Sequence, residues 1–210
     1  MTQDGEGILW TDSLTKHFGQ VTAVDDVSVS FADDELCAII GPNGAGKTTF
    51  INLLAGTMQP TEGRIEFMGE DVTELAPHEI SNRGLIRSFQ ITEIFEDVSV
   101  IENVRLGLQQ HINPYVFWRD YTAGNDLRAE ARDILARVGL EGKADRPATE
   151  LSHGEERTLE LAITLGAEPD ILLLDEPTSG MSPEETAEVI TIIEDISEEV
   201  PILLVEHKMS

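Results

Sequence analysis

The sequence contains a single cysteine, Cys37, and only four lysines among its 210 residues. One cysteine excludes an internal disulfide framework and a cysteine-rich metal cluster. Long apolar runs are also missing: Ile171–Leu174 and Ile202–Val205 are uninterrupted aliphatic runs of only four residues, whereas a membrane-spanning helix needs about 20. The acidic, polar start at Met1–Gly7 predicts no signal peptide. These absences favour a soluble intracellular domain.

Basic side chains are scarce as well. The chain has 14 lysines and arginines against 40 acidic residues, which gives a formal net charge of −26. This charge argues against a nucleic-acid partner, because phosphate backbones are bound by basic side chains. Since the acidic residues occur along the whole chain, we interpret them as an adaptation to a halophilic cytoplasm, where salt screens self-repulsion. The alternative is an ordinary acidic protein with a strongly solvated face.

Short apolar runs alternate with helical patterns. We expect buried strands at Cys37–Ile40, Ile171–Leu174 and Pro201–Val205, and further short strands at Ile65–Met68 and Gly84–Ser88. The expected helices are 48–55, a helical block over 100–166 with an amphipathic face at Leu127, Ala131, Ile134, Leu135 and Val138, and a helix opened by Ser182, Pro183 and Glu185. This order predicts an α/β domain with a mostly parallel sheet and an inserted helical subdomain.

The segment Gly41–Thr48 reads Gly-Pro-Asn-Gly-Ala-Gly-Lys-Thr and lies between an expected strand and an expected helix. Glycines in this pattern let backbone N–H groups surround a phosphate at the positive end of the helix dipole. Lys47 would add a cation at the β- and γ-phosphates, and the Thr48 hydroxyl would bind Mg²⁺. The motif predicts a nucleotide site.

Two carboxylates, Asp175 and Glu176, follow the apolar run Leu172–Leu174. In a chain with a phosphate-binding loop, this pattern predicts that Asp175 reaches the Mg²⁺ region and that Glu176 polarises a water beside the γ-phosphate.

The segment Leu151–Glu155 opens a helix, with Ser152 as its N-cap and Glu155 three residues later. This pattern is a capping box. A second interpretation is that the Ser152 hydroxyl and the Gly154 amide face a phosphate bound by another subunit.

With these motifs in this order, from about Ile8 to His207, the chain resembles the ATP-binding subunits of ATP-binding-cassette (ABC) transporters. The resemblance implies a P-loop NTPase (RecA-like) core with a mostly parallel sheet, an N-terminal antiparallel β region and an inserted helical subdomain. It implies one domain over 1–210, in which 1–90 and 167–210 form the core and 91–166 form the helical subdomain with the signature motif.

The resemblance also assigns roles to residues. Phe18 is expected to stack on adenine, and Ser179–Ser182 resembles the D-loop. The expected catalytic residues are Glu176, Gln90 and His207. The expected nucleotide-binding residues are Phe18, Gly41, Pro42, Asn43, Gly44, Ala45, Gly46, Lys47, Thr48 and Thr49. The signature expected to act on a partner's ATP is Ser152, His153, Gly154 and Glu155, and the expected Mg²⁺ residues are Thr48, Gln90 and Asp175, the last through water.

Several residues depart from the family pattern. His153 replaces the first signature glycine, Glu155 replaces the signature glutamine, and Ser182 stands where the D-loop usually has Asp or Asn. Lys208 stands where Asp is usual. The sequence ends three residues after His207, where family members continue, so the resemblance implies a truncated C-terminus.

The expected function is ATP hydrolysis that energises an ABC importer, for branched-chain amino acids or a related small polar solute. The segments Pro77–Ile80 and Arg87–Gln90 carry that likeness. The alternatives are a urea or short-amide importer ATPase, an ATP-binding remnant with little turnover, and a soluble ABC protein acting on DNA, ribosomes or cofactor assembly, which the net charge disfavours.

The expected ligands are ATP and Mg²⁺. The expected partners are a second ABC ATPase subunit, transmembrane permeases and, indirectly, an extracellular solute-binding protein, with no nucleic acid. The expected location is peripheral, on the cytoplasmic side of the cell membrane. The aromatic-rich segment 111–125 favours a local structural cluster over a partner-binding patch.

Overall fold

The computed structural model describes residues 7–33, 36–88, 94–109 and 123–206. The chain forms two compact units. Unit 1 comprises Met1–Arg87, Asp170–Glu176 and Ser197–Ser210, and unit 2 comprises Ser88–Pro169 and Pro177–Ile196. Across the described ranges, none of the helices combines the length and the apolar character needed to cross a membrane.

Unit 1 contains an antiparallel sheet near the N-terminus. Its strand order is β2-β1-β5-β6, with β3 paired to β1. Phe18 of β1 pairs with Val21 of β2, so the hairpin turns through Gly19 and Gln20, and Gly19 has a φ of +61°. The strands are β1 (Leu9–Phe18), β2 (Val21–Val27), β3 (Ser30–Phe31), β5 (Glu62–Phe67) and β6 (Glu70–Asp71). This sheet confirms the expected N-terminal β region.

The second sheet of unit 1 is entirely parallel, with the strand order β4-β9-β8-β7. Its strands are β4 (Leu36–Ile40), β7 (Leu85–Arg87), β8 (Ile171–Asp175) and β9 (Ile202–Glu206). Because all four run the same way, their carboxyl ends meet at one edge, which is where open α/β sheets bind ligands. The expected parallel sheet is confirmed.

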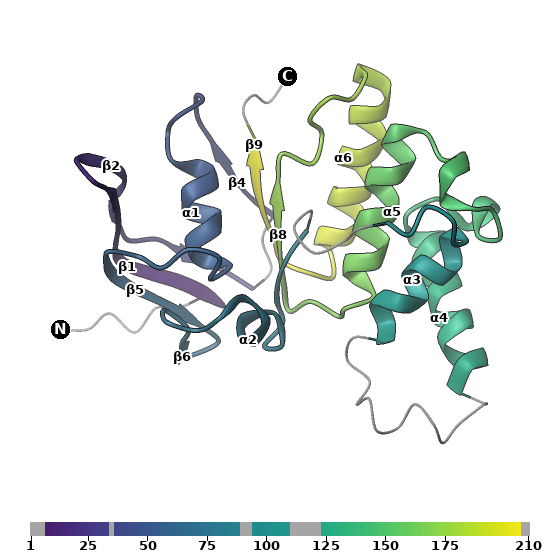
Figure 1. The fold of residues 1–210 in the computed structure, drawn as a ribbon, viewed down its shortest axis with the longest axis horizontal. Coiled ribbons are helices and arrows are strands. Elements are labelled where there is room, and N and C mark those ends of the chain that lie inside the picture. Colours follow the sequence, from purple (N-terminus) through teal and green to yellow (C-terminus); the bar gives the residue numbers. More distant parts are fainter. Residues whose placement is uncertain (1–6, 34–35, 89–93, 110–122, 207–210) are drawn as a thin grey trace. The chain divides into compact units, whose positions relative to one another are not determined.

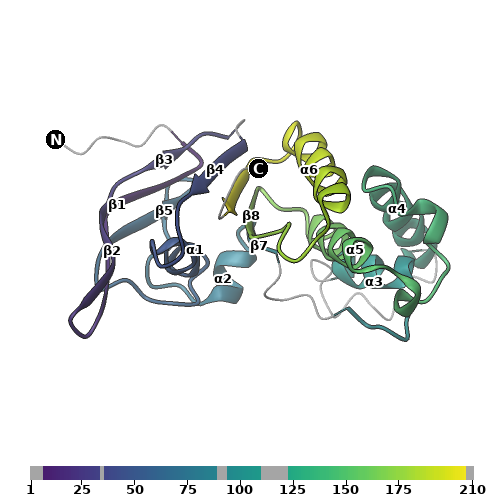
Figure 2. The same ribbon diagram turned by 90° about the horizontal axis from the view of Figure 1, so that it is seen from above.

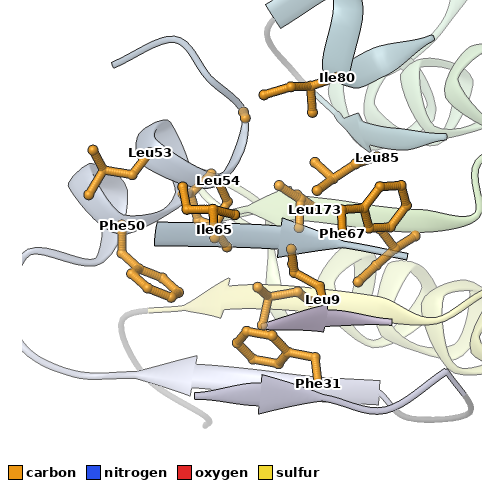
Figure 3. Close-up of a cluster of buried hydrophobic side chains, with 14 of the residues drawn as sticks. Leu9, Phe31, Phe50, Leu53, Leu54, Ile65, Phe67, Ile80, Leu85 and Leu173 are labelled. Carbon is orange, nitrogen blue, oxygen red and sulfur yellow. The ribbon is translucent and has the colours of Figure 1, made fainter. Parts of the chain in front are cut away.

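Helix α1 (Lys47–Leu54) lies between the two sheets and contacts β2 and β8 (Figures 1 and 2). Its apolar side chains join those of both sheets in one core, with Leu85 of β7 and Ile80 of the short helix α2 (Pro77–Ser81) on the same cluster (Figure 3). The core residues Leu53, Leu54 and Leu173 are at most 1% exposed. Burial on this scale contributes about 1.5–3 kcal/mol for each such side chain and fixes α1 relative to β8.

Unit 2 is helical. It contains α3 (Val100–Leu108), α4 (Ala123–Arg137), α5 (His153–Leu165) and α6 (Pro183–Ser197), the last of which extends one residue beyond the unit, and the 3₁₀ turns Glu141–Lys143 and Ala148–Glu150. Helix α3 packs against α4 and α5. The amphipathic face expected for α4 is buried at Ala131, Ile134 and Leu135. Residues 177–196 belong to this unit, and Glu185 near the start of α6 lies beside Gly154 near the start of α5.

Candidate nucleotide site

The loop between β4 and α1 has the backbone of a phosphate cradle. Gly44 and Gly46 have φ values of +81° and +84°, a left-handed region that favours glycine. Gly46 is the N-cap of α1, and no side chain caps the helix. A helix start of this kind, without a side-chain cap, is suited to binding an anion.

Lys47, the first residue of α1, is only 7% exposed. Its Nζ donates hydrogen bonds to the carbonyl oxygens of Gly41 at 2.7 Å and of Pro42 at 3.1 Å. The loop carbonyls thus hold the ammonium group inside the loop. Thr48 is exposed and Thr49 is half-buried.

The β1–β2 hairpin packs directly against this loop. A Cβ atom on Gly46 would lie 2.0 Å from the carbonyl oxygen of Ala23 in β2, so only glycine allows this approach. At the hairpin's turn, the Phe18 ring is 47% exposed, and Lys16 Nζ lies 5.5 Å from its centroid. An exposed aromatic ring on a hairpin that contacts the loop is suited to stacking on a flat ligand.

Asp175 and Glu176 lie at the carboxyl end of β8. Asp175 Oδ1 is buried and has no hydrogen-bond partner among the described residues. Glu176 has a φ of +53°, and its N–H donates to the Val205 carbonyl at 2.9 Å. A left-handed backbone conformation costs free energy for a glutamate, and local strain of this kind occurs at functional sites.

Arg87 and Asn52 complete this part of the site, and neither was expected from the sequence. Arg87 Nη2 donates to Asp175 Oδ2 at 2.8 Å, and Arg87 Nη1 donates to Asn52 Oδ1 at 2.5 Å. The arginine and aspartate side chains are only 9% and 13% exposed. The sequence carries no signal for this pair, because 88 positions separate the two residues.

In unit 2, the start of α5 has the expected capping box. Ser152 is the N-cap; its N–H donates to Glu155 Oε2 at 3.0 Å, and its Oγ accepts from the Glu155 N–H at 3.4 Å. Lys143 forms an ion pair with Glu155, and this contact, with the Ser152 bonds, lowers the pKa of Glu155 against the opposing effect of burial. The charge that replaces the usual glutamine is therefore compensated within the unit.

Glu185, at the start of α6, also contacts the N-terminus of α5. Its carboxylate accepts the Ser182 N–H at 2.9 Å and also the Gly154 N–H, and these bonds lower the pKa of Glu185. Sequence reasoning identified Glu185 only as a cap for α6. The N-terminus of α5 thus already holds an anion at Gly154. His153 is exposed and contacts Glu156, with Nδ1 3.4 Å from Oε2.

Unit 1 contains Gly41–Thr49, Asp175, Glu176 and Phe18, and unit 2 contains Ser152–Glu155 and Ser179–Ser182. Gln90, His207, Lys208 and most of the aromatic segment 111–125 lie outside the described residues. A phosphate cradle at the start of α1, beside carboxylates at the end of β8, defines a P-loop nucleotide-binding protein.

Comparisons with known proteins specify the class further. The ABC transporter family matches residues 24–179. A high-affinity branched-chain amino acid transport ATP-binding protein, BraF of Pseudomonas aeruginosa, is 36% identical over 96% of this chain and 82% of its own length. A probable branched-chain amino acid transport ATP-binding protein, LivG of Methanocaldococcus jannaschii, is 32% identical over 99% of this chain and 82% of its own length.

Among solved structures, the ADP conformation of MJ1267, an ATP-binding cassette of an ABC transporter, superposes with a TM-score of 0.82 at 29% identity, over 97% of this chain and 82% of that one. The chain belongs to the ABC transporter family. It is the ATP-hydrolysing subunit of such a transporter. These comparisons do not bear on salt, so the halophilic source stays a prediction.

Proposed function

We propose that this chain energises the import of branched-chain amino acids. The observation that carries the proposal is the identity of 36% with BraF over 96% of the chain. The chain would work on the cytoplasmic face of the membrane as a peripheral subunit. Its partners would be a second ATPase subunit, the permeases that form the path and, indirectly, an extracellular solute-binding protein.

ATP would be bound by the P-loop and the hairpin of unit 1. The N–H groups of Gly41–Thr49 would surround the phosphates, and the positive end of the α1 dipole would favour their charge. Lys47 would exchange its bonds with the Gly41 and Pro42 carbonyls for bonds with phosphate oxygens, which are stronger acceptors because they are charged. Phe18 would stack on the base.

The residues present fit a magnesium ion. Asp175 Oδ1 is a buried oxygen without a partner among the described residues, and Thr48 is an exposed residue of α1 that carries a hydroxyl. No group of three or more His, Cys, Asp or Glu residues within the described ranges could hold a metal. Mg²⁺ suits such a sparse site, because it is usually held by one or two carboxylates together with substrate phosphates and water. When bound, it would neutralise charge on the phosphates; Thr48, Gln90 and Asp175 would hold it.

Hydrolysis would depend on Glu176. Its carboxylate would accept the proton of the attacking water, and Gln90 and His207 would orient that water for in-line attack. The ATP would be closed off by the signature segment Ser152–Glu155 of a second subunit. This role of the signature segment is supported by the N-terminus of α5, where the Glu185 carboxylate accepts a hydrogen bond from the Gly154 N–H. A phosphate oxygen would replace that carboxylate when two subunits close.

The solute is tested in vesicles that contain the permeases and a saturating solute-binding protein. We expect leucine to stimulate ATP hydrolysis by this chain and Lys47→Ala to abolish that stimulation. If urea or a short amide stimulates hydrolysis and leucine does not, the transported solute is urea or a short amide and not a branched-chain amino acid. Nucleotide binding without turnover under both conditions would instead favour an ATP-binding remnant.

A further inference from the structure

Arg87 occupies a place in unit 1 that the phosphate and carboxylate motifs do not account for. It is the last residue of β7, which pairs with β8 so that Arg87 lies opposite Leu173. Paired residues point to the same face of a sheet, and so do residues two apart along one strand. Arg87 therefore shares a face with both Leu173 and Asp175. That face packs against α1, because Leu173 belongs to the core that includes Leu53 and Leu54.

Two nitrogens of the Arg87 guanidinium group donate hydrogen bonds to side chains on two different elements. Nη2 bonds Asp175 Oδ2 on β8 at 2.8 Å, and Nη1 bonds Asn52 Oδ1 on α1 at 2.5 Å. Asn52 Oδ1 also accepts a bond from the Thr57 hydroxyl at 3.2 Å, which anchors the amide beyond the end of the helix. The planar, permanently charged fork of arginine can make both bonds in one fixed geometry, and a lysine ammonium cannot.

The two elements that Arg87 joins each carry one of the groups proposed to hold Mg²⁺. Thr48 lies one helical turn before Asn52 on α1, so the two side chains are on the same helix face. Asp175 presents Oδ1, which has no partner among the described residues, while Arg87 holds Oδ2. Because Mg²⁺ requires near-octahedral geometry, the spacing between Thr48 and Asp175 determines how well both can serve it.

We propose that Arg87 is a positioning residue of the nucleotide site. It ties Asp175 to α1 through Asn52, fixes the spacing of the Asp175 and Thr48 side chains, and turns Asp175 Oδ1 towards the metal. It also gives the Asp175 carboxylate, which is only 13% exposed, an oppositely charged partner, because an unpaired buried charge is costly. The inference rests on the proposed roles of Asp175 and Thr48, and on no step of the hydrolysis.

The test measures the magnesium gain, defined as the affinity for a fluorescent ATP analogue with saturating Mg²⁺ divided by its affinity in EDTA. Arg87→Met keeps the apolar stem and removes the fork. We expect its magnesium gain to fall about 10-fold, the lower end of what loss of a residue that orients a metal ligand costs, with the affinity in EDTA unchanged. A merely structural role would weaken both affinities together and leave their ratio intact.

Three further variants make the result specific. Arg83→Met is the matched control, because Arg83 lies four residues earlier and forms an exposed ion pair with Glu70 at 2.9 Å; its magnesium gain should stay at the wild-type value. Asn52→Ala removes only the second anchor and should lower the gain less than Arg87→Met. Arg87→Lys restores the charge without the fork, should give an intermediate gain, and carries the test if Arg87→Met does not fold.

Asp175→Asn separates failure of this inference from failure of the proposed site. A normal magnesium gain in Asp175→Asn would show that Asp175 does not serve the metal, and the site assignment would be wrong. A lost gain in Asp175→Asn together with an unchanged or increased gain in Arg87→Met would overturn only the role of Arg87. An increase would mean that Arg87 merely repels the metal.

Discussion

Replacing Gly46 with alanine tests the conformation of the phosphate-binding loop directly. Gly46 has a φ of +84°, and alanine in the left-handed region costs about 1–2 kcal/mol. The new Cβ would also lie 2.0 Å from the Ala23 carbonyl oxygen. Relieving such a contact costs about 1–3 kcal/mol more. We therefore expect the free energy of unfolding to fall by about 2–5 kcal/mol in Gly46→Ala.

The matched control is Gly44→Ala in the same loop. Gly44 has a φ of +81°, but no atom lies within 4 Å of its hypothetical Cβ, so only the conformational cost applies. Each kcal/mol shifts the Tm of a chain of this size by about 2–4 °C. Thermal unfolding followed by circular dichroism should therefore place the Tm of Gly46→Ala about 2–12 °C below that of Gly44→Ala. Equal Tm values would refute the packing of the hairpin on the loop.

Three further predictions concern the rest of the chain. At neutral pH, Lys143→Met should have a lower free energy of unfolding than the wild type. Because the pKa of Glu155 is lowered in the folded state, this difference should shrink as the pH falls below about 4.3, the ordinary pKa of a glutamate. A difference that does not change with pH in chemical denaturation would contradict this ion pair. Leu135→Ala, at a fully buried position of α4, should lower the free energy of unfolding by about 2–5 kcal/mol in urea titrations, and a loss below 1 kcal/mol would argue against the helix packing of unit 2. Because the net charge is −26, the Tm should fall as the KCl concentration is reduced from molar to about 0.1 M, where the Debye length grows to about 10 Å. A Tm that does not change over this range would contradict the halophilic interpretation.

Features that depend on neighbouring residues could be predicted from the sequence. The phosphate-binding loop and the capping boxes at Ser152 and Ser182 are local patterns, in which spacing alone determines which groups can meet. The amphipathic face of α4 is also local, because the helical period places Ala131 and Leu135 on one side.

Contacts between distant segments could not be predicted in this way. The pair Arg87–Asp175 requires β7 to lie beside β8 in one specific register, and the sequence of neither strand specifies its neighbour. The contact between Glu185 and Gly154 similarly depends on how α6 packs against α5. In the sequence, the capping box at Ser182 already accounts for a glutamate at position 185. Nothing in the pattern therefore indicates its second bond, to Gly154.

The central claim is that Glu176 is the carboxylate that activates the attacking water in an ATPase of the ABC family. The most direct test is steady-state phosphate release by Glu176→Gln with Mg²⁺ and ATP, which keeps the shape of the side chain but removes its basicity. Turnover should fall by about 10²- to 10⁴-fold, while ATP binding persists and the variant elutes as a dimer with ATP and as a monomer with ADP. Lys47→Ala should instead lose both binding and dimerisation. Near-normal turnover in Glu176→Gln would contradict the assignment of the catalytic carboxylate.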